Sequence, residues 1–214
     1  MTTINQANIP KEWYYHDYDK LSSFISYYYQ VNLFRELQCR RLLEVGIGNK
    51  TISRYLKSHG YDVTTCDYNE NLKPDHVADI RELPFDDNSY DAIMACEILE
   101  HLPWNDVPIA LSELKRVARR CVIISLPVIS FYLEFVFKFP LVNQIFKIPH
   151  MDIFFSLPLV TFKMRPKHHE WEIGARNYPI RKIRKAVSNY FRIVKEVRPV
   201  LNPRHRFFVL EKMP

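Results

Sequence analysis

A short apolar segment that ends in two glycines constrains this chain more than any other feature. Residues 42–48 read LLEVGIG, and a second apolar segment, residues 61–66, ends at Asp67. The order is therefore strand, glycine-rich turn, helix, strand and carboxylate. Glycines let a backbone approach a ligand closely, and a carboxylate after the second strand can accept hydrogen bonds from ribose hydroxyls. The pattern predicts a nucleotide-type cofactor site in an open α/β sheet.

The spacing of the glycines distinguishes two kinds of cofactor. A dinucleotide-binding turn reads G-x-G-x-x-G, and Thr51 stands where its third glycine belongs. Glu44 lies two residues before Gly46. An acidic residue at that position resembles the start of motif I, E/D-x-G-x-G-x-G, of the class I S-adenosylmethionine-dependent methyltransferases. Lys50 departs from that motif, because the family usually has a third glycine there.

Three further segments carry the same resemblance in the same order. Residues 77–85 (VADIRELPF) look like the third-strand segment of the family. Residues 89–96 (SYDAIMAC) indicate a buried fourth strand, and residues 97–103 (EILEHLP) resemble the E-x-L-E-H-L segment that follows it. Residues 121–125 indicate a fifth strand. Over about residues 20–126 the chain therefore resembles the type 11 methyltransferases.

The resemblance implies a set of cofactor-binding residues at the carboxyl ends of the strands. In the family, motif I shapes the methionine side of the cofactor, and the carboxylate after the second strand holds the ribose. The third-strand segment contacts adenine, and the end of the fourth strand forms the floor near the sulfonium. The residues implied here are Glu44, Gly46, Gly48, Asp67, Tyr68, Asp79, Ile80, Cys96 and Glu97.

The E-x-x-E-H segment also suggests a metal site. Glu97, Glu100 and His101 occupy positions i, i+3 and i+4, which share one face if the segment is helical. His169 supplies a further imidazole from downstream. Two carboxylates with one or two imidazoles can hold Mg²⁺, Mn²⁺ or Zn²⁺. The arrangement resembles that of the ubiquinone-pathway O-methyltransferases and of the small-RNA 3′-terminal 2′-O-methyltransferases, in which a metal orients the acceptor hydroxyls.

Without a metal, the same residues have simpler roles. Methyltransferases with no known metal also carry E-x-L-E-H-L, and there Glu97 faces the cofactor while Glu100 and His101 cap or solvate the start of a helix. His101 or His169 is then the best candidate for a general base, since an imidazole titrates near neutral pH. Trp171, close to His169, could stack on an acceptor or equally lie in the core.

The chain is expected to form a single domain of four parts. Residues 1–40 form an N-terminal helical cap, and residues 41–126 form the cofactor-binding core. Residues 127–166, rich in aromatic side chains, form an inserted lid over the substrate pocket, with a membrane surface as the alternative partner. Residues 167–214 add a basic helix and an antiparallel hairpin. The expected fold is thus a Rossmann-like α/β fold, with a seven-stranded, mostly parallel sheet and helices on both faces.

The composition and net charge of the chain indicate which partners its surface attracts and where in the cell it is expected. The net charge is +6, and such a surface attracts phosphates, anionic lipids or nucleic acid. No basic stripe with interleaved aromatic residues is obvious, however. The four cysteines are scattered, the N-terminus shows no signal-peptide core, and no run reaches the ~18 apolar residues of a membrane span. These features predict a cytoplasmic protein, with peripheral contact to a membrane as a variant.

The expected activity is S-adenosylmethionine-dependent O-methylation of a small molecule, a glycan or a lipid-linked intermediate. An RNA 2′-O-methyltransferase is one alternative, favoured by the basic charge and the E-x-x-E-H segment. A non-catalytic, cofactor-binding scaffold subunit is another, and Lys50 keeps it open. An NAD-dependent oxidoreductase is disfavoured by Thr51. The acceptor and the oligomeric state are not encoded in any motif of the chain.

Overall fold

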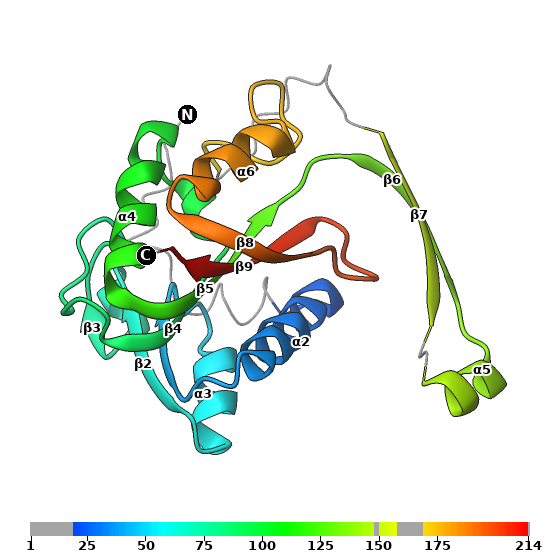
Figure 1. Ribbon diagram of the computed structural model, residues 1–214, viewed down its shortest axis with the longest axis horizontal. Helices are drawn as coiled ribbons and strands as arrows, with labels where there is room; N and C mark the ends of the chain where they lie inside the picture. Colours follow the sequence, from blue (N-terminus) through cyan, green and yellow to red (C-terminus); the bar gives the residue numbers. More distant parts are fainter. Residues whose placement is uncertain (1–18, 148–149, 158–168, 214) are drawn as a thin grey trace.

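The computed structural model describes residues 19–147, 150–157 and 169–213. Seven strands of this part of the chain form one sheet in the order β3-β2-β1-β4-β5-β9-β8 (Figure 1). Neighbouring strands among β1 to β5 pair in parallel, whereas β9 pairs antiparallel with both β5 and β8. The strands are β1 (Arg41–Val45), β2 (Asp62–Asp67), β3 (His76–Val77), β4 (Tyr90–Cys96), β5 (Ala118–Pro127), β8 (Phe191–Val197) and β9 (His205–Lys212). The predicted Rossmann-like sheet is confirmed.

The sheet separates two hydrophobic cores, because successive side chains of a strand point to opposite faces. In β1, Leu43 belongs to one core and Leu42 to the other. In β5, Ile124 and Ile123 divide in the same way. All four side chains are fully buried. The central strands are therefore covered on both sides, as parallel strands usually are.

Helices cover both faces of the sheet (Figure 1). The helices α4 (Val107–Val117) and α6 (Ile180–Ser188) contribute to one core, and α2 (Leu21–Glu36) and α3 (Thr51–Ser58) contribute to the other. Each helix buries residues spaced three or four apart, which is the repeat of an amphipathic helix. The buried set of α4 is Val107, Ala110, Leu111, Leu114 and Val117. The shorter 3₁₀ turns are η2 (Glu70–Leu72), η3 (Leu99–His101) and η4 (Trp104–Asp106).

The segment predicted as a lid contains a separate two-stranded ladder. β6 (Phe131–Phe137) pairs antiparallel with β7 (Met151–Leu157), and α5 (Pro140–Phe146) lies between them in sequence. Figure 1 shows the ladder extending beyond the seven-stranded sheet, with α5 at its far end. Residues 148–149 and 158–166 of the predicted lid, like residues 1–18 of the predicted cap, lie outside the described residues. Within the described ranges, the structure holds no helix with the length and apolar character needed to cross a bilayer.

Candidate cofactor and acceptor site

The glycine-rich turn between β1 and α3 contains three residues with positive φ. Gly46, Gly48 and Lys50 have φ values of 80°, 47° and 64°. A Cβ on Gly46 would lie 2.0 Å from Cδ1 of Ile98, so a larger residue would displace that side chain. Lys50 adopts the left-handed conformation that glycine tolerates best, which explains why glycine is usual there in the related motif. The helix α3 nevertheless begins directly after it, at Thr51.

Asp67, the last residue of β2, ties this turn to the following loop. Its carboxylate accepts hydrogen bonds from the backbone N–H groups of Ile47 and Asn69, each at 2.9 Å. Burial raises the pKa of Asp67, although the N–H groups of Asn69, Ile47 and Tyr68 lower it. The Tyr68 side chain is 44% exposed. The structure therefore places the Asp67 carboxyl group beside the glycine turn, at the carboxyl end of the parallel strands.

Glu44 is buried beneath the same turn. One carboxylate oxygen, Oε2, has no hydrogen-bond partner among the described residues. Burial raises the pKa of Glu44 to about 8, despite a hydrogen bond with Ser53 in the first turn of α3. Burial therefore favours the protonated form of this carboxyl group.

Asp79 and Ile80 follow β3. Asp79 is paired with Arg81, whose guanidinium donates to both carboxylate oxygens at 2.9 and 2.6 Å and also reaches Asp106 at 2.6 Å. These hydrogen bonds from Arg81 lower the pKa of Asp79. Ile80 is buried. An adenine amino group would thus meet a carboxylate that already binds Arg81, a residue that no sequence motif marks.

The turn after β4 differs from the helical segment expected from the sequence. Glu97 has a φ of 56°, which lies outside the α-helical region, so the 3₁₀ turn η3 begins only at Leu99. The segment is therefore not one helix, and the condition under which Glu97, Glu100 and His101 would share a helix face is not met. Glu97 instead accepts a hydrogen bond from the Ser125 hydroxyl at 2.8 Å, and its backbone N–H donates to the Ser125 carbonyl.

The other carboxylate oxygen of Glu97 is the first member of a series of neighbouring polar side chains that no sequence motif marks. Oε2 lies 3.7 Å from Nε2 of His205, the first residue of β9. Nδ1 of His205 lies 3.2 Å from the hydroxyl of Ser26 in α2, and Gln30 donates to the same hydroxyl. The only sequence signal for His205 is its place at the start of an antiparallel strand, which brings it to the edge where the parallel strands end.

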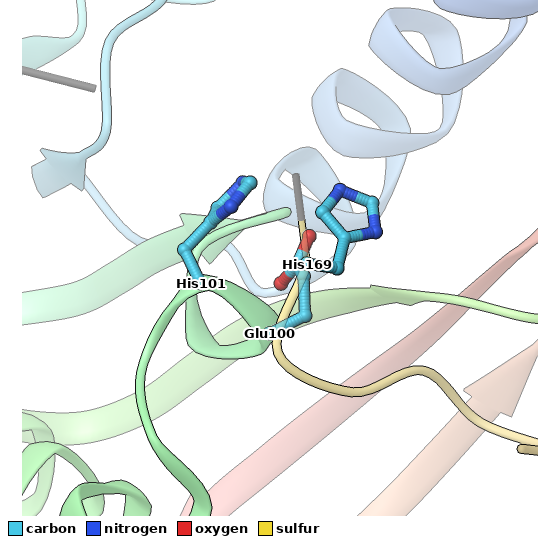
Figure 2. A group of neighbouring side chains, drawn as sticks. All are labelled: Glu100, His101 and His169. Atoms are coloured by element: carbon cyan, nitrogen blue, oxygen red, sulfur yellow. The ribbon is translucent and has the colours of Figure 1, made fainter. Parts of the chain in front are cut away.

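Three of the predicted metal ligands lie together at the same edge. Glu100, His101 and His169 each offer a ligand atom, and these atoms lie within 4.8 Å of one another. Figure 2 shows the side chains converging, Glu100 and His101 from the turn after β4 and His169 from the segment before α6. Glu97 is not a member of this group, because its carboxylate faces Ser125 and His205.

Glu100 is the least solvated member of the cluster. Its side chain is fully buried, and neither carboxylate oxygen has a hydrogen-bond partner among the described residues. Burial, and then the negative charge of Glu97, raise the pKa of Glu100 well above its usual value. An isolated carboxylate in such a place is costly unless it is protonated or bound to a cation.

The imidazole of His169 contacts a neighbouring carboxylate. Its Nδ1 lies 2.7 Å from Oε1 of Glu172. The backbone N–H of Glu170 donates to the carbonyl of Glu100 at 2.8 Å, which fixes this segment against the turn after β4. The neighbouring His168 lies outside the described residues.

Trp171 belongs to the core rather than to an exposed acceptor wall. Its side chain is 2% exposed, and its indole N–H donates to the carbonyl of Leu102 at 3.1 Å. The ring packs edge-on against Trp104, with centroids 5.0 Å apart. Of the two roles open for Trp171, the structure therefore supports the core role.

The N-terminal helix reaches the glycine turn through Asn49. The Asn49 amide donates to Asp19, just before α2, at 2.8 Å, and its carbonyl oxygen accepts from the N–H of Thr51. Tyr27 of α2 also hydrogen-bonds Asn49, and burial raises the pKa of Tyr27 to about 12. Residues from α2 thus border the turn, in the place expected for the cap.

Comparison with known proteins agrees with this geometry. Residues 43–124 match the family model of a methyltransferase domain. No curated protein matches the chain in sequence.

Three solved structures illustrate the likeness in fold. An S-adenosylmethionine-dependent methyltransferase from Clostridium acetobutylicum superposes with a TM-score of 0.63 at 12% identity, covering 95% of this chain and 99% of that one. The 1,6-didemethyltoxoflavin-N1-methyltransferase from Burkholderia thailandensis gives 0.62 at 10% identity, covering 95% and 85%. The N-methyltransferase NodS from Bradyrhizobium japonicum gives 0.60 at 10% identity, covering 97% and 95%. The latter two contain S-adenosylhomocysteine. Residues 43–124 therefore match a methyltransferase domain, and the chain has the fold of S-adenosylmethionine-dependent methyltransferases.

Proposed function

We propose that the protein transfers a methyl group from S-adenosylmethionine to an oxygen atom of a small molecule, a glycan or a lipid-linked intermediate. The observation that carries the proposal is the positive-φ turn at Gly46 and Gly48, beside the carboxyl group of Asp67. This turn lies at the carboxyl end of β1, next to the point where the strand order reverses between β1 and β4. Ligands of open α/β sheets bind at such switch points.

The residues around the turn fit this cofactor. Gly46 and Gly48 adopt the positive φ values of a tight turn, and the start of α3 would offer N–H groups to the methionine carboxylate. Asp67 would accept from the ribose hydroxyls, the Ile80 backbone would meet the adenine ring, and Glu97 would lie near the sulfonium. The cofactor supplies an activated methyl group, so the protein chiefly positions the acceptor and removes its proton.

An imidazole is the best-placed group to accept that proton. His101 and His169 are the candidates predicted from the sequence for the case in which no cation binds their nitrogens, and the structure adds His205. Nε2 of His205 lies 3.7 Å from a carboxylate oxygen of Glu97, so this imidazole lies beside the residue expected near the sulfonium.

A methyl-transfer assay tests the proposal. Purified protein would be incubated with methyl-labelled S-adenosylmethionine and with separate lipid, polysaccharide, small-molecule and RNA fractions of a cell extract. We expect label in one of the first three fractions, with an NMR shift of the labelled carbon typical of an O-methyl group. Asp67→Asn should lower the transfer by about tenfold or more, because it removes the charged ribose acceptor. Label confined to RNA would favour the RNA 2′-O-methyltransferase, and no transfer would favour a non-catalytic scaffold.

We also propose a divalent cation, such as Mg²⁺, Mn²⁺ or Zn²⁺, at Glu100, His101 and His169. The unpartnered oxygens of the buried Glu100 support this, since a cation would compensate for their lost solvation. Glu172 contacts Nδ1 of His169 and so orients the ring, as a carboxylate commonly does for a histidine that binds a metal. A bound cation would supply Lewis-acid chemistry toward an acceptor hydroxyl.

Calorimetric titration with Mn²⁺ alone tests the metal site. We expect one bound ion for the wild type and no binding for Glu100→Gln, which keeps the shape but removes the charge. Glu170→Gln is the matched control, because Glu170 is exposed and adjacent to His169. Equal binding by the wild type and Glu100→Gln would exclude this cluster as the site.

A further inference from the structure

One face of the β6–β7 ladder consists entirely of large apolar side chains. Alternate residues of a strand share a face, and the register pairs Phe131 with Leu157 and Phe137 with Met151 at the two ends. The face comprises Phe131, Leu133, Phe135, Phe137, Met151, Ile153, Phe155 and Leu157. Each of these side chains is between 42% and 66% exposed.

This face is larger than a soluble monomer normally shows to water. About half of the surface of eight large side chains is exposed, which amounts to roughly 800 Å². The largest apolar patch of a typical monomer is about 300–600 Å², and larger patches mark protein or membrane contacts. The ladder therefore has an interaction surface that the methyl-transfer site does not use.

The opposite face of the ladder is attached to the body of the protein. Arg198, after β8, donates to Glu134 at 2.6 Å and pairs with Asp152, and it lies 3.9 Å from the centroid of the Phe154 ring. The backbone N–H of Leu201 also donates to Glu134. These contacts hold one face toward the β8–β9 turn, so the apolar face is turned away from it.

The positively charged side chains of the ladder lie at its far end, beside α5. The described residues 131–147 and 150–157 carry four charged side chains, Glu134, Lys138, Lys147 and Asp152. The two acidic ones are paired with Arg198, whereas both lysines flank α5. The lysines are accompanied by three exposed apolar side chains, those of Phe139, Ile145 and Phe146.

We propose that this apolar face and the α5 tip bind the surface of a lipid bilayer that carries anionic headgroups. Aromatic and aliphatic side chains can enter the boundary between headgroups and acyl chains, while lysines reach the phosphates. The main competing occupant is a second copy of the chain. A protein interface of this size normally has a polar rim and several hydrogen bonds, whereas the face itself carries no polar side chain. Self-association would also bring no acidic partner from the ladder to Lys138 and Lys147.

Co-sedimentation of the full chain with vesicles tests the proposal, and it requires neither cofactor nor activity. We expect binding to vesicles of phosphatidylcholine with phosphatidylglycerol, and much weaker binding to phosphatidylcholine alone. Phe135→Ser with Phe155→Ser should weaken the binding by about tenfold or more. Ile109→Ser with Tyr55→Ser is the matched control, because these side chains of α4 and α3 are 50% and 42% exposed. The control should bind as the wild type does.

A second pair of variants tests the charge. Lys138→Glu with Lys147→Glu should remove the preference for the anionic vesicles. Arg35→Glu with Arg54→Glu changes the net charge equally, on exposed positions of α2 and α3, and should preserve that preference. Absence of vesicle binding, or equal binding by the Phe135 and Phe155 variant, would overturn the proposal. A dimer in sedimentation velocity that dissociates in this variant, without vesicle binding, would assign the face to a second copy.

Discussion

Glu44 is buried beneath the glycine-rich turn, and its titration affects the stability of the folded chain. In an unfolded chain its carboxyl group would titrate near the ordinary value, whereas burial in the folded chain raises the pKa to about 8. A folded-state pKa above the unfolded one means that the folded protein holds the proton more tightly. The resulting stabilisation is fully present below the unfolded pKa, and it is lost as the pH rises toward 8.

Glu44→Gln should therefore flatten the pH dependence of stability. Glutamine keeps the shape of the side chain and removes the titration. Between pH 5 and 8.5, the free energy of unfolding of the wild type should fall by roughly 2–4 kcal/mol more than that of the variant. Urea denaturation at several pH values measures the difference.

The exposed carboxylate of Glu82 provides the control for this experiment. Glu82→Gln should follow the pH profile of the wild type. Some pH dependence should persist in Glu44→Gln, because burial also raises the pKa of Glu100. Identical slopes for the wild type and Glu44→Gln would show that Glu44 is not buried as a neutral acid.

At the scale of elements, the core was predictable because its signals are local. The expected strand at residues 61–66 is β2, Asp62–Asp67, and the basic helix expected within residues 167–214 is α6, Ile180–Ser188. Apolar runs, glycine turns and helix periodicity depend on neighbours in sequence, so they can be seen in one chain. The turn after β4 was not predictable in this way, since the positive φ of Glu97 breaks a pattern that looks helical.

The β6–β7 ladder is a second element for which the local sequence was not enough to predict the structure. Its first strand reads FYLEFVF, in which apolar residues occupy both faces. A strand that alternates apolar and polar residues reveals its buried face, but this one does not. The contacts of Glu134, Asp152 and Phe154 with Arg198, far apart in sequence, show which face meets the body of the protein. The inserted segment was therefore detectable, but its outward apolar face was not.

At the scale of the whole molecule, the candidate site brings residues of α2 and β9 next to a residue that follows β4. Ser26 from α2 and His205 from β9 meet although they are separated by 179 residues, and Glu97 lies next to His205. Such contacts depend on the strand order, so they follow from the fold rather than from any motif. The motif residues Glu44, Gly46 and Asp67 were predictable, whereas the Glu97–His205–Ser26 chain required the structure.

Above all, we propose that the turn at Gly46 and Gly48, with Asp67 beside it, binds S-adenosylmethionine. Calorimetric titration of the full chain with this compound, in the presence of EDTA, tests it most directly. We predict one site of micromolar affinity, weakened by about tenfold or more in Asp67→Asn, with Asp86→Asn as an exposed control that binds normally. Lack of binding by the wild type, or equal affinity of the wild type and Asp67→Asn, would contradict the claim.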